Sequence, residues 1–202
     1  MSRMSPDITG ALLSLLHPGE TVLDVGSGDA SLLQALSGRG LTLCGIDPSY
    51  RDGQCPALPP DVSLQAGSGE ALPFRDSVFD AVVLQCVFSL CKPEETVREI
   101  LRVLKPGGRL ILSDLFTDSP AAETVFTGSP LLSRLYLRQH LERFFSSGFR
   151  PVSFQDMTDA LRELIIEVIW DGEDCASCGD LAALRGAKAR YGLWVWQKSD
   201  SL

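Results

Sequence analysis

A short apolar run that leads directly into two glycines constrains this chain most. Residues 21–30 read Thr-Val-Leu-Asp-Val-Gly-Ser-Gly-Asp-Ala. This pattern predicts a buried strand, a tight glycine turn and the start of a helix. Glycines let the backbone approach a ligand closely, and the unpaired N–H groups of a helix start attract polar or negative atoms. We therefore expect an α/β sheet with a ligand site at this turn.

Two acidic residues narrow the choice of ligand. Asp24 precedes the first glycine, where its anion could face an ammonium group. Asp47 ends a second apolar segment about 20 residues after the turn, where a carboxylate can accept both ribose hydroxyl hydrogens. A dinucleotide-binding motif requires a third glycine at the position of Ser31, and the turn contains no Lys or Arg that could pair with phosphates. The pattern favours S-adenosylmethionine (SAM), a nucleoside with a zwitterionic tail, and makes an NAD-linked oxidoreductase a distant alternative.

Apolar segments and turn residues predict the remaining elements. Asp29 or Ser27 is expected to cap the helix after the glycine turn, and the Lys-Pro-Gly-Gly sequence from Lys105 to end another helix. Strands that alternate with helices imply a parallel sheet with helices on both faces. The predicted strands cover 21–25, 41–46, 62–66, 81–85, 110–115, 151–154 and 193–197, and the predicted helices cover 8–16, 29–36, 93–104, 131–146 and 159–170.

Composition indicates one globular domain over residues 1–202, with 45% hydrophobic and 22% charged residues. A net charge of −8 argues against a nucleic-acid partner, because binding to phosphate backbones is mostly cationic. The apolar run 11–16 is too short for a membrane span and lacks the layout of a signal peptide. We therefore expect a cytoplasmic protein whose six cysteines are thiols.

Four sequence blocks carry a resemblance to a known family. The chain resembles a class I SAM-dependent methyltransferase of the type 11, small-molecule branch, which is similar to ubiquinone and menaquinone methyltransferases. The blocks span roughly residues 20–115, and together they are specific, although each alone is weak. They are Val-Leu-Asp-Val-Gly-Ser-Gly at 22–28, Gly-Ile-Asp at 45–47, Gly-Glu-Ala-Leu-Pro-Phe at 69–74 with Phe-Asp-Ala-Val-Val at 79–83, and Leu-Arg-Val-Leu-Lys-Pro-Gly-Gly-Arg-Leu at 101–110.

This resemblance implies a Rossmann-like sheet of seven mostly parallel strands, with helices on both faces and an antiparallel last strand between the fifth and sixth. It also implies SAM as cofactor. The chain departs from the family between Asp47 and Val62, where a proline-rich segment replaces a helix and where Tyr50 could stack on adenine. The residues that the resemblance places at the cofactor are Asp24, Gly26, Ser27, Gly28, Asp47, Pro48, Ser68, Gly69, Gln85 and Cys86.

The methyl acceptor is expected to be a small molecule, and the sequence leaves its identity and the oligomeric state open. Asp114 and His140 are candidates for a general base, although Asp114 could instead cap a loop and His140 could be a solvated residue. Segment 117–145 is a candidate substrate lid. A SAM-binding module without catalysis is the alternative from another class.

The cysteines suggest a second class of acceptor. Five of the six are expected at the edge of the sheet that holds the cofactor, which would suit a thiol or a trivalent metalloid acceptor. Cys175 and Cys178 have metal-ligand spacing, but no second pair completes a zinc site. A solvated loop with incidental cysteines is the simpler interpretation.

Overall fold

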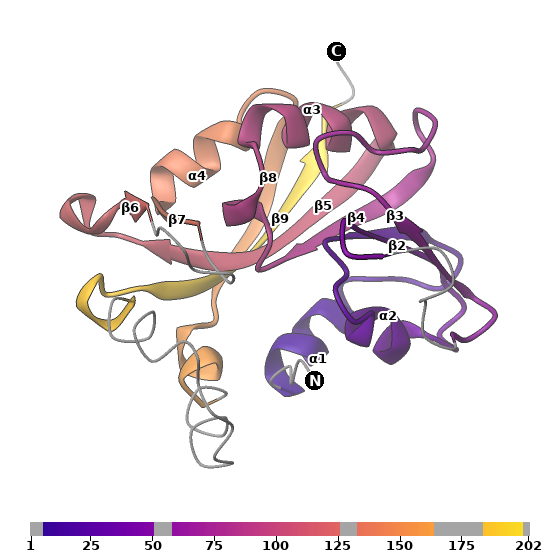
Figure 1. Ribbon diagram of the computed structural model, residues 1–202, viewed down its shortest axis with the longest axis horizontal. Coiled ribbons are helices and arrows are strands. Elements are labelled where there is room, and N and C mark those ends of the chain that lie inside the picture. The colour runs from indigo at the N-terminus through magenta and orange to yellow at the C-terminus, as the bar shows by residue number, and fades with distance from the viewer. Residues whose placement is uncertain (1–5, 51–57, 126–132, 164–183, 200–202) are drawn as a thin grey trace.

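The structure, a computed structural model, describes residues 6–50, 58–125, 133–163 and 184–199. Nine strands form one mixed sheet (Figure 1). The strands are β1 Thr21–Val25, β2 Thr42–Asp47, β3 Val62–Ala66, β4 Phe79–Gln85, β5 Leu104–Thr117, β6 Thr124–Val125, β7 Arg134–Leu137, β8 Phe149–Asp156 and β9 Arg190–Lys198. The helices are α1 Pro6–Ser14, α2 Ser31–Leu36, α3 Pro93–Val103 and α4 Arg138–Phe145, with short 3-10 helices η1 Phe88–Leu90 and η2 Pro120–Ala122.

The first five strands are parallel in the order β3-β2-β1-β4-β5. β9 runs antiparallel to β5, and β8 pairs antiparallel with the other side of β9. The hairpin β6-β7 joins the end of β5 at Phe116 and Thr117. The chain order reverses between β1 and β4, and open α/β sheets bind ligands beyond the carboxyl ends of the strands at such a point.

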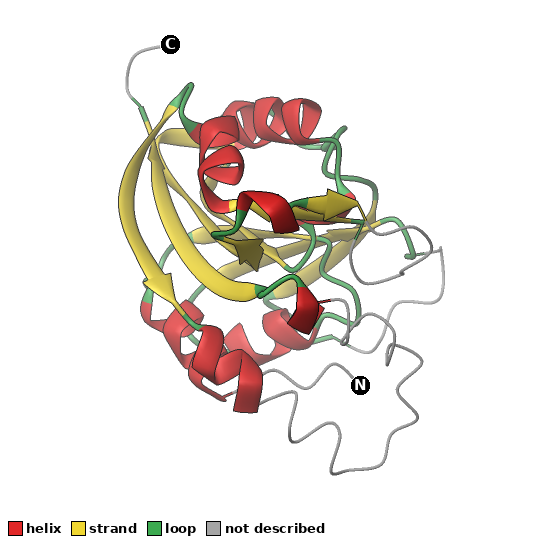
Figure 2. Ribbon diagram, turned by 90° about the vertical axis from the view of Figure 1, so that its left-hand side faces the viewer, coloured by secondary structure: helices red, strands yellow, loops and turns green. Residues whose placement is uncertain are grey.

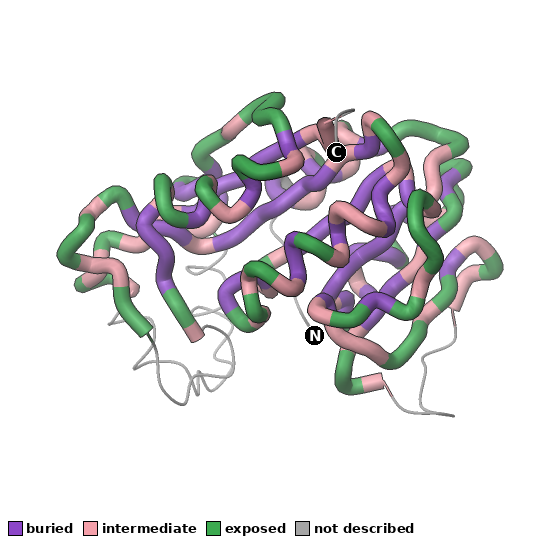
Figure 3. The backbone as a smooth tube through the Cα atoms, turned by 90° about the horizontal axis from the view of Figure 1, so that it is seen from above, coloured by how far each residue is buried: buried purple, intermediate pink, exposed green. Residues whose placement is uncertain are grey.

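Helices cover both faces of the sheet, with α3 and α4 on one side and α1 and α2 on the other (Figures 1 and 2). The buried residues form two clusters accordingly, one around Ile100, Phe145 and Trp194 and one around Leu12 and Leu33. Burial is concentrated along the central strands, while the helices expose their outer faces (Figure 3). The sequence therefore builds a three-layer domain in which the sheet supplies the shared core.

The predicted sheet is confirmed, with an addition. The path β3-β2-β1-β4-β5-β9-β8 is the expected set of strands, and β9 lies antiparallel between β5 and β8. The hairpin β6-β7 adds two strands, so the described sheet has nine strands and not the expected seven.

The helix predicted over 131–146 is wrong in its first half. Within the described residues, β7 precedes α4, which begins at Arg138. Leu135, Tyr136 and Leu137 are buried in succession, and a continuous apolar run fits a buried strand as well as a buried helix. The strand prevails because its backbone pairs with β6 and with the end of β5. Of the helix predicted over 159–170, residues 158–163 are helical and the rest lies outside the described residues.

Of the two predicted caps of α2, Asp29 is confirmed and Ser27 is not. Ala30 takes the N-cap position with φ 63°, and no side chain caps the helix there. The Asp29 carboxylate instead accepts a hydrogen bond from the backbone N–H of Ser31 at 3.1 Å. The hydroxyl of Ser27 forms a hydrogen bond with the hydroxyl of Tyr50 and not with the helix. Asp29 therefore satisfies one of the free N–H groups at the start of α2, although it stands one residue before the N-cap position.

β8 forms one edge of the sheet, and among the described strands it pairs with β9 alone. Its pairing register shifts between Pro151 and Ser153, and most of its residues are exposed. No helix in the described part of the chain combines the length and hydropathy needed to cross a lipid bilayer.

Candidate functional site

Backbone hydrogen bonds fix the turn after β1. The N–H groups of Gly26 and Ser27 both donate to the Ile46 carbonyl oxygen in β2, at 2.8 and 3.1 Å. Both glycines have positive φ, 75° at Gly26 and 51° at Gly28. A Cβ atom at Gly26 would lie 2.4 Å from Cγ2 of Val87, whereas in the described chain a Cβ at Gly28 would meet nothing within 4 Å. The turn is therefore closed toward β4 at Gly26 and has space for a ligand at Gly28.

Asp24 is a buried carboxyl group that accepts no hydrogen bond from the described residues. It is 3% exposed, and no donor in the described chain reaches its side chain. Burial, with a smaller contribution from the charge of Asp47, raises the pKa of Asp24 from 3.8 to about 7. Buried polar groups are normally paired, so an unpaired acid beside a glycine turn indicates a cationic ligand.

Asp47 ends β2 and faces the turn, as the sequence predicts. Its Oδ2 accepts the N–H of Gly28 at 3.0 Å, and its Oδ1 accepts the N–H and the hydroxyl of Ser49 at 2.8 and 2.5 Å. The side chain is only half-buried. Asp47 therefore holds Gly28 in place while it stays accessible to the hydroxyl groups of a ligand.

The residues on either side of Asp47 close this part of the site. Ser27 is buried, and its hydroxyl lies 3.0 Å from the hydroxyl of Tyr50. Pro48 is exposed in the turn between Asp47 and Tyr50. The Tyr50 hydroxyl is thus tied to the glycine turn, and stacking of the ring on adenine stays a prediction. Most of the proline-rich segment after Tyr50 lies outside the described residues.

The loop after β3 lies beside Asp47. The N–H of Gly67 donates to the Asp47 carbonyl oxygen at 3.3 Å. Ser68 forms an isolated bridge with Ala71, and a Cβ atom at Gly69 would lie 3.1 Å from Cγ1 of Val25 in β1. The structure therefore brings Ser68 and Gly69 to the carboxyl edge next to the first two strands.

Gln85 and Cys86 follow on the other side of the turn, at the end of β4. Gln85 is half-buried, and Cys86 is exposed with a left-handed φ of 53°. The Cys86 thiol lies 3.3 Å from the hydroxyl of Tyr191 in β9. Sequence reasoning missed Tyr191, because only the register of the antiparallel last strand brings its first residues to this edge. The signal that could have found it is the aromatic residue at the start of that strand.

Asp114 lies next to the site but is occupied by backbone groups. It is buried, its Oδ1 accepts the N–H of Leu115 at 2.7 Å, and its Oδ2 accepts the N–H of Ser89 at 3.3 Å. Burial raises the pKa of Asp114 to about 6, although these N–H groups oppose the shift. The carboxylate therefore secures η1 to β5, which is the capping role that the sequence left open.

The second candidate base, His140, pairs with Glu123 on the surface. Its Nδ1 lies 2.8 and 3.0 Å from the two carboxyl oxygens of Glu123, which also accepts the N–H of Leu137. His140 is exposed at the start of α4. The structure thus ties His140 to the segment after η2 and does not bring it to the glycine turn.

The described residues contain no group of three or more His, Cys, Asp or Glu side chains that could hold a metal ion. Cys55, Cys175 and Cys178 lie outside the described residues. Burial is the main cause that raises the pKa of Cys86 to about 12 and that of Cys91 to about 11. Because thiolates bind metals and metalloids, these two protonated thiols do not support a metalloid acceptor.

The donor set at the turn fits SAM. The unpaired acid of Asp24 suits an ammonium group, the carboxylate of Asp47 suits ribose hydroxyls, and the space at Gly28 admits a ligand. The sheet topology and the donor set together resemble those of a class I SAM-dependent methyltransferase domain with a Rossmann-like sheet. In agreement, residues 23–112 match the family model described as "Methyltransferase domain".

Curated relatives carry methyltransferase names. A demethylmenaquinone methyltransferase of Renibacterium salmoninarum is 34% identical over 116 residues, which are 55% of this chain and 46% of the relative. An uncharacterized methyltransferase of Mycobacterium leprae is 32% identical over 150 residues, which are 68% of this chain and 56% of the relative. The chain thus spans about half the length of the curated relatives that it matches.

Solved structures share the fold at low sequence identity. The [4+2]-cyclase SpnF has a TM-score of 0.75 and 22% identity, and the match covers 96% of this chain and 81% of that one. Phosphoethanolamine N-methyltransferase 2 of Haemonchus contortus, solved with SAM, has a TM-score of 0.70 and 18% identity, with coverage of 96% and 53%. Since one neighbour is named as a cyclase, the fold alone does not fix the reaction, which depends on the residues of the site.

Proposed function

We propose that this chain binds SAM across the glycine turn and catalyses methyl transfer to a small-molecule acceptor. The observation that carries the proposal is the buried Asp24 carboxyl group, which has no hydrogen-bond donor among the described residues and lies beside Asp47. A buried carboxylate without a partner destabilises the folded protein unless a ligand supplies a cation that pairs with it. The methyltransferase names of the matched domain and of the relatives, and a structural neighbour solved with SAM, support the same cofactor.

Each residue of the turn has a proposed task. Asp24 pairs with the ammonium group, Asp47 with the ribose hydroxyls, and the backbone at Gly26, Ser27 and Gly28 lines the tail of the cofactor. Pro48, Ser68 and Gly69 border the adenosine, and Gln85 lies beside the methionine portion. These tasks follow the order of β2, β1 and β4 along the carboxyl edge of the sheet.

When bound, SAM supplies an electrophilic methyl group on a sulfonium leaving group. The chain's own contribution is alignment, because a displacement of this kind needs the nucleophile, carbon and sulfur in line. Pre-alignment of this type can lower a barrier by about 7–11 kcal/mol. Neither Asp114 nor His140 is needed for that task, since each already has a structural partner.

Isothermal titration calorimetry with SAM and with S-adenosylhomocysteine tests the cofactor site. We expect Asp47→Asn to weaken both ligands at least about tenfold, because charge-assisted hydrogen bonds contribute about 1.5–3 kcal/mol each. Asp159→Asn is the matched control, since Asp159 is exposed and pairs with Arg162 alone among the described residues. Equal affinity in wild type and Asp47→Asn would contradict the ribose role.

A methyl-transfer screen tests the reaction. Release of S-adenosylhomocysteine would be followed with quinols and phenolic acids as acceptors. Turnover of any acceptor supports the enzyme, whereas tight SAM binding without turnover would point to a binding module. The acidic net charge of −8 argues against a nucleic-acid acceptor. The free thiols of Cys44, Cys86 and Cys91 are consistent with the cytoplasmic location that we propose.

A further inference from the structure

A short segment after β4 closes the glycine turn on the side of that strand. Three carbon atoms of the Val87 side chain would lie 2.4, 3.0 and 3.3 Å from a Cβ atom placed at Gly26, so this side chain packs against the Gly26 backbone. Val87 comes directly before η1, and its carbonyl oxygen accepts the N–H of Leu90 at 2.9 Å. The position of η1 therefore decides where the Val87 side chain meets the turn.

β5 holds this segment on both sides of Val87. On one side, the N–H of Cys86 donates to the Ser113 carbonyl oxygen at 2.8 Å. On the other side, the Asp114 carboxylate accepts the N–H groups of the first two residues of η1, with a distance of 3.3 Å to the nitrogen of Ser89. The first N–H groups of a helical turn have no acceptor within the turn. Val87 thus lies between one backbone contact and one side-chain contact, both from β5.

Other contacts keep η1 attached to the domain from its far side. Phe88 is fully buried, with its ring centroid 6.1 Å from that of Tyr136 and 5.0 Å from that of Phe145. The hydroxyl of Ser133, just before β7, donates to the Ser89 carbonyl oxygen. Loss of the carboxylate contact from β5 would therefore leave η1 in place as an element and change how it sits against β5.

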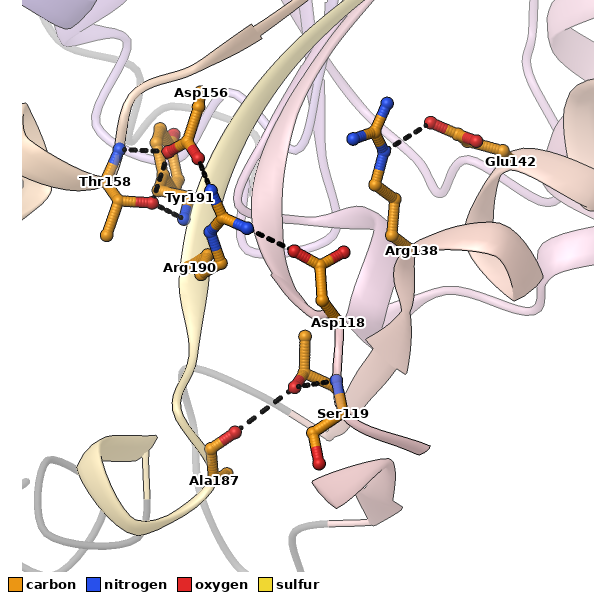
Figure 4. A network of polar contacts seen from close by, with 10 residues as sticks. Asp118, Ser119, Arg138, Glu142, Asp156, Thr158, Ala187, Arg190 and Tyr191 are labelled. Atoms are coloured by element: carbon orange, nitrogen blue, oxygen red, sulfur yellow. Dashed lines mark hydrogen bonds and ion pairs between the residues drawn. The ribbon is translucent and has the colours of Figure 1, made fainter. Parts of the chain in front are cut away.

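A polar network fixes the carboxyl end of β5 (Figure 4). Arg190 of β9 bridges Asp118, which follows β5, and Asp156 at the end of β8. The hydroxyl of Thr117 donates to the Ala187 carbonyl oxygen at 3.2 Å. β9 also pairs with β5 along most of its length. β5 is therefore the fixed side of the contact with η1, and η1 is the side that would shift if the contact were lost.

We propose that Asp114 is a positioning residue of the cofactor site, which holds Val87 against Gly26 through η1 and thereby sets the affinity for SAM. This inference rests on the proposed function, because it requires that SAM binds at the glycine turn. Asp114 acts without touching the cofactor or the acceptor. Its carboxylate serves as a hydrogen-bond acceptor for the backbone of η1, and this role is separate from that of a general base.

Calorimetry with S-adenosylhomocysteine at pH 8 tests this coupling in wild type, Asp114→Asn, Val87→Ala and the double variant. We expect Asp114→Asn to weaken binding at least about fivefold, because an NH2 donor replaces an accepting oxygen and coupling between two sites is typically of this size or larger. In the Val87→Ala background, the same substitution should change the Kd less than about twofold, because η1 then has no large side chain to hold against Gly26. Equal effects in both backgrounds, or wild-type affinity in Asp114→Asn, would overturn the inference.

Arg109→Met is the control for a general loss of stability. Arg109 lies toward the amino end of β5, where its guanidinium pairs with Glu20 and donates to the Leu15 carbonyl oxygen. This control should bind S-adenosylhomocysteine with a Kd within about twofold of wild type, although its melting temperature should fall. Equal weakening in Arg109→Met and Asp114→Asn would assign the effect to stability and overturn the inference. If the wild type itself does not bind, the proposed function fails, and that result is distinct.

Amide hydrogen exchange, measured by NMR, tests the same coupling without a substitution at Asp114. Coupling between two sites is reciprocal, so bound S-adenosylhomocysteine should stabilise the contact between Asp114 and η1. Exchange of the Phe88 and Ser89 N–H groups in wild type should therefore slow at least about fivefold at saturation, and Val87→Ala should abolish this slowing. Unchanged exchange in saturated wild type, or slowing that persists in Val87→Ala, would refute the positioning role.

Discussion

Titration of SAM into the free protein at a series of pH values from 5.5 to 8.5 tests the state of Asp24. In the free protein, burial and Asp47 raise the pKa of Asp24 to about 7, so the carboxyl group is mostly protonated below that pH. An ammonium group bound beside it favours the ionised form. Binding should therefore release about one proton per SAM below pH 7, and the Kd should weaken about tenfold for each pH unit lowered.

The magnitude follows from the raised pKa. The difference between 3.8 and about 7 corresponds to about 4 kcal/mol, which is the most that a bound cation can recover at Asp24. Above about pH 8 the α-amino group of SAM loses its own proton, so affinity should fall again. Calorimetry in buffers of different ionisation enthalpy counts the released protons. A Kd that is the same at pH 5.5 and 7.5 would refute the reasoning.

Asp24→Asn is the matched variant, and stability gives an independent measurement. The folded protein keeps the Asp24 proton to a higher pH than the unfolded chain, so wild-type stability falls as pH rises from about 4 to about 7. The stability of the variant should not fall in this way as pH rises. At pH 8 the free energy of unfolding of the free variant should exceed that of wild type by at most about 4 kcal/mol, and its melting temperature should be higher accordingly. The variant should bind SAM weakly, and its Kd should not change with pH below pH 7.

Three further substitutions test the structure. Gly26→Ala should lower the free energy of unfolding by about 1–3 kcal/mol, because φ is 75° and the new Cβ would lie 2.4 Å from Cγ2 of Val87. In urea unfolding, the double variant with Val87→Ala should recover part of this loss. Arg102→Met should cost about 2 kcal/mol, since its guanidinium bonds to Glu99 and to the carbonyl oxygens of Leu72 and Phe74; a loss below 0.5 kcal/mol would contradict this. Asp114→Asn should cost about 1–3 kcal/mol, because a donating NH2 group replaces one of the two accepting oxygens, and thermal unfolding measures the loss.

Much of the fold was predictable because local pattern and burial agree. β1 and β3 have the predicted bounds, since β1 is a short, mostly apolar run and β3 alternates apolar with polar residues. α3 begins at Pro93 as predicted, with Glu94 and Glu95 in its first turn and Arg102 in its last. β7 was not predictable, because a short apolar sequence fits a buried strand and a buried helix equally well. Only its pairing with β5 decides between the two.

The candidate site was predictable where it follows from one strand and its turn. Asp24, Gly26 and Gly28 lie together because they are close in sequence, and Asp47 joins them because β2 is parallel to β1. Tyr191 was missed because its contact with Cys86 joins residues 105 positions apart through the register of β9. The roles of Asp114 and His140 depended on partners, Ser89 and Glu123, that no spacing in the sequence reveals.

The shift in register along β8 affects how the protein behaves at high concentration. Pro151 has no N–H to donate, and the irregular pairing between Pro151 and Ser153 interrupts the row of backbone groups that a neighbouring molecule would need. Replacing that proline with valine would restore an uninterrupted template for intermolecular strand addition. We expect self-association of the purified variant to become faster, because the edge of β8 would then offer one more backbone N–H group.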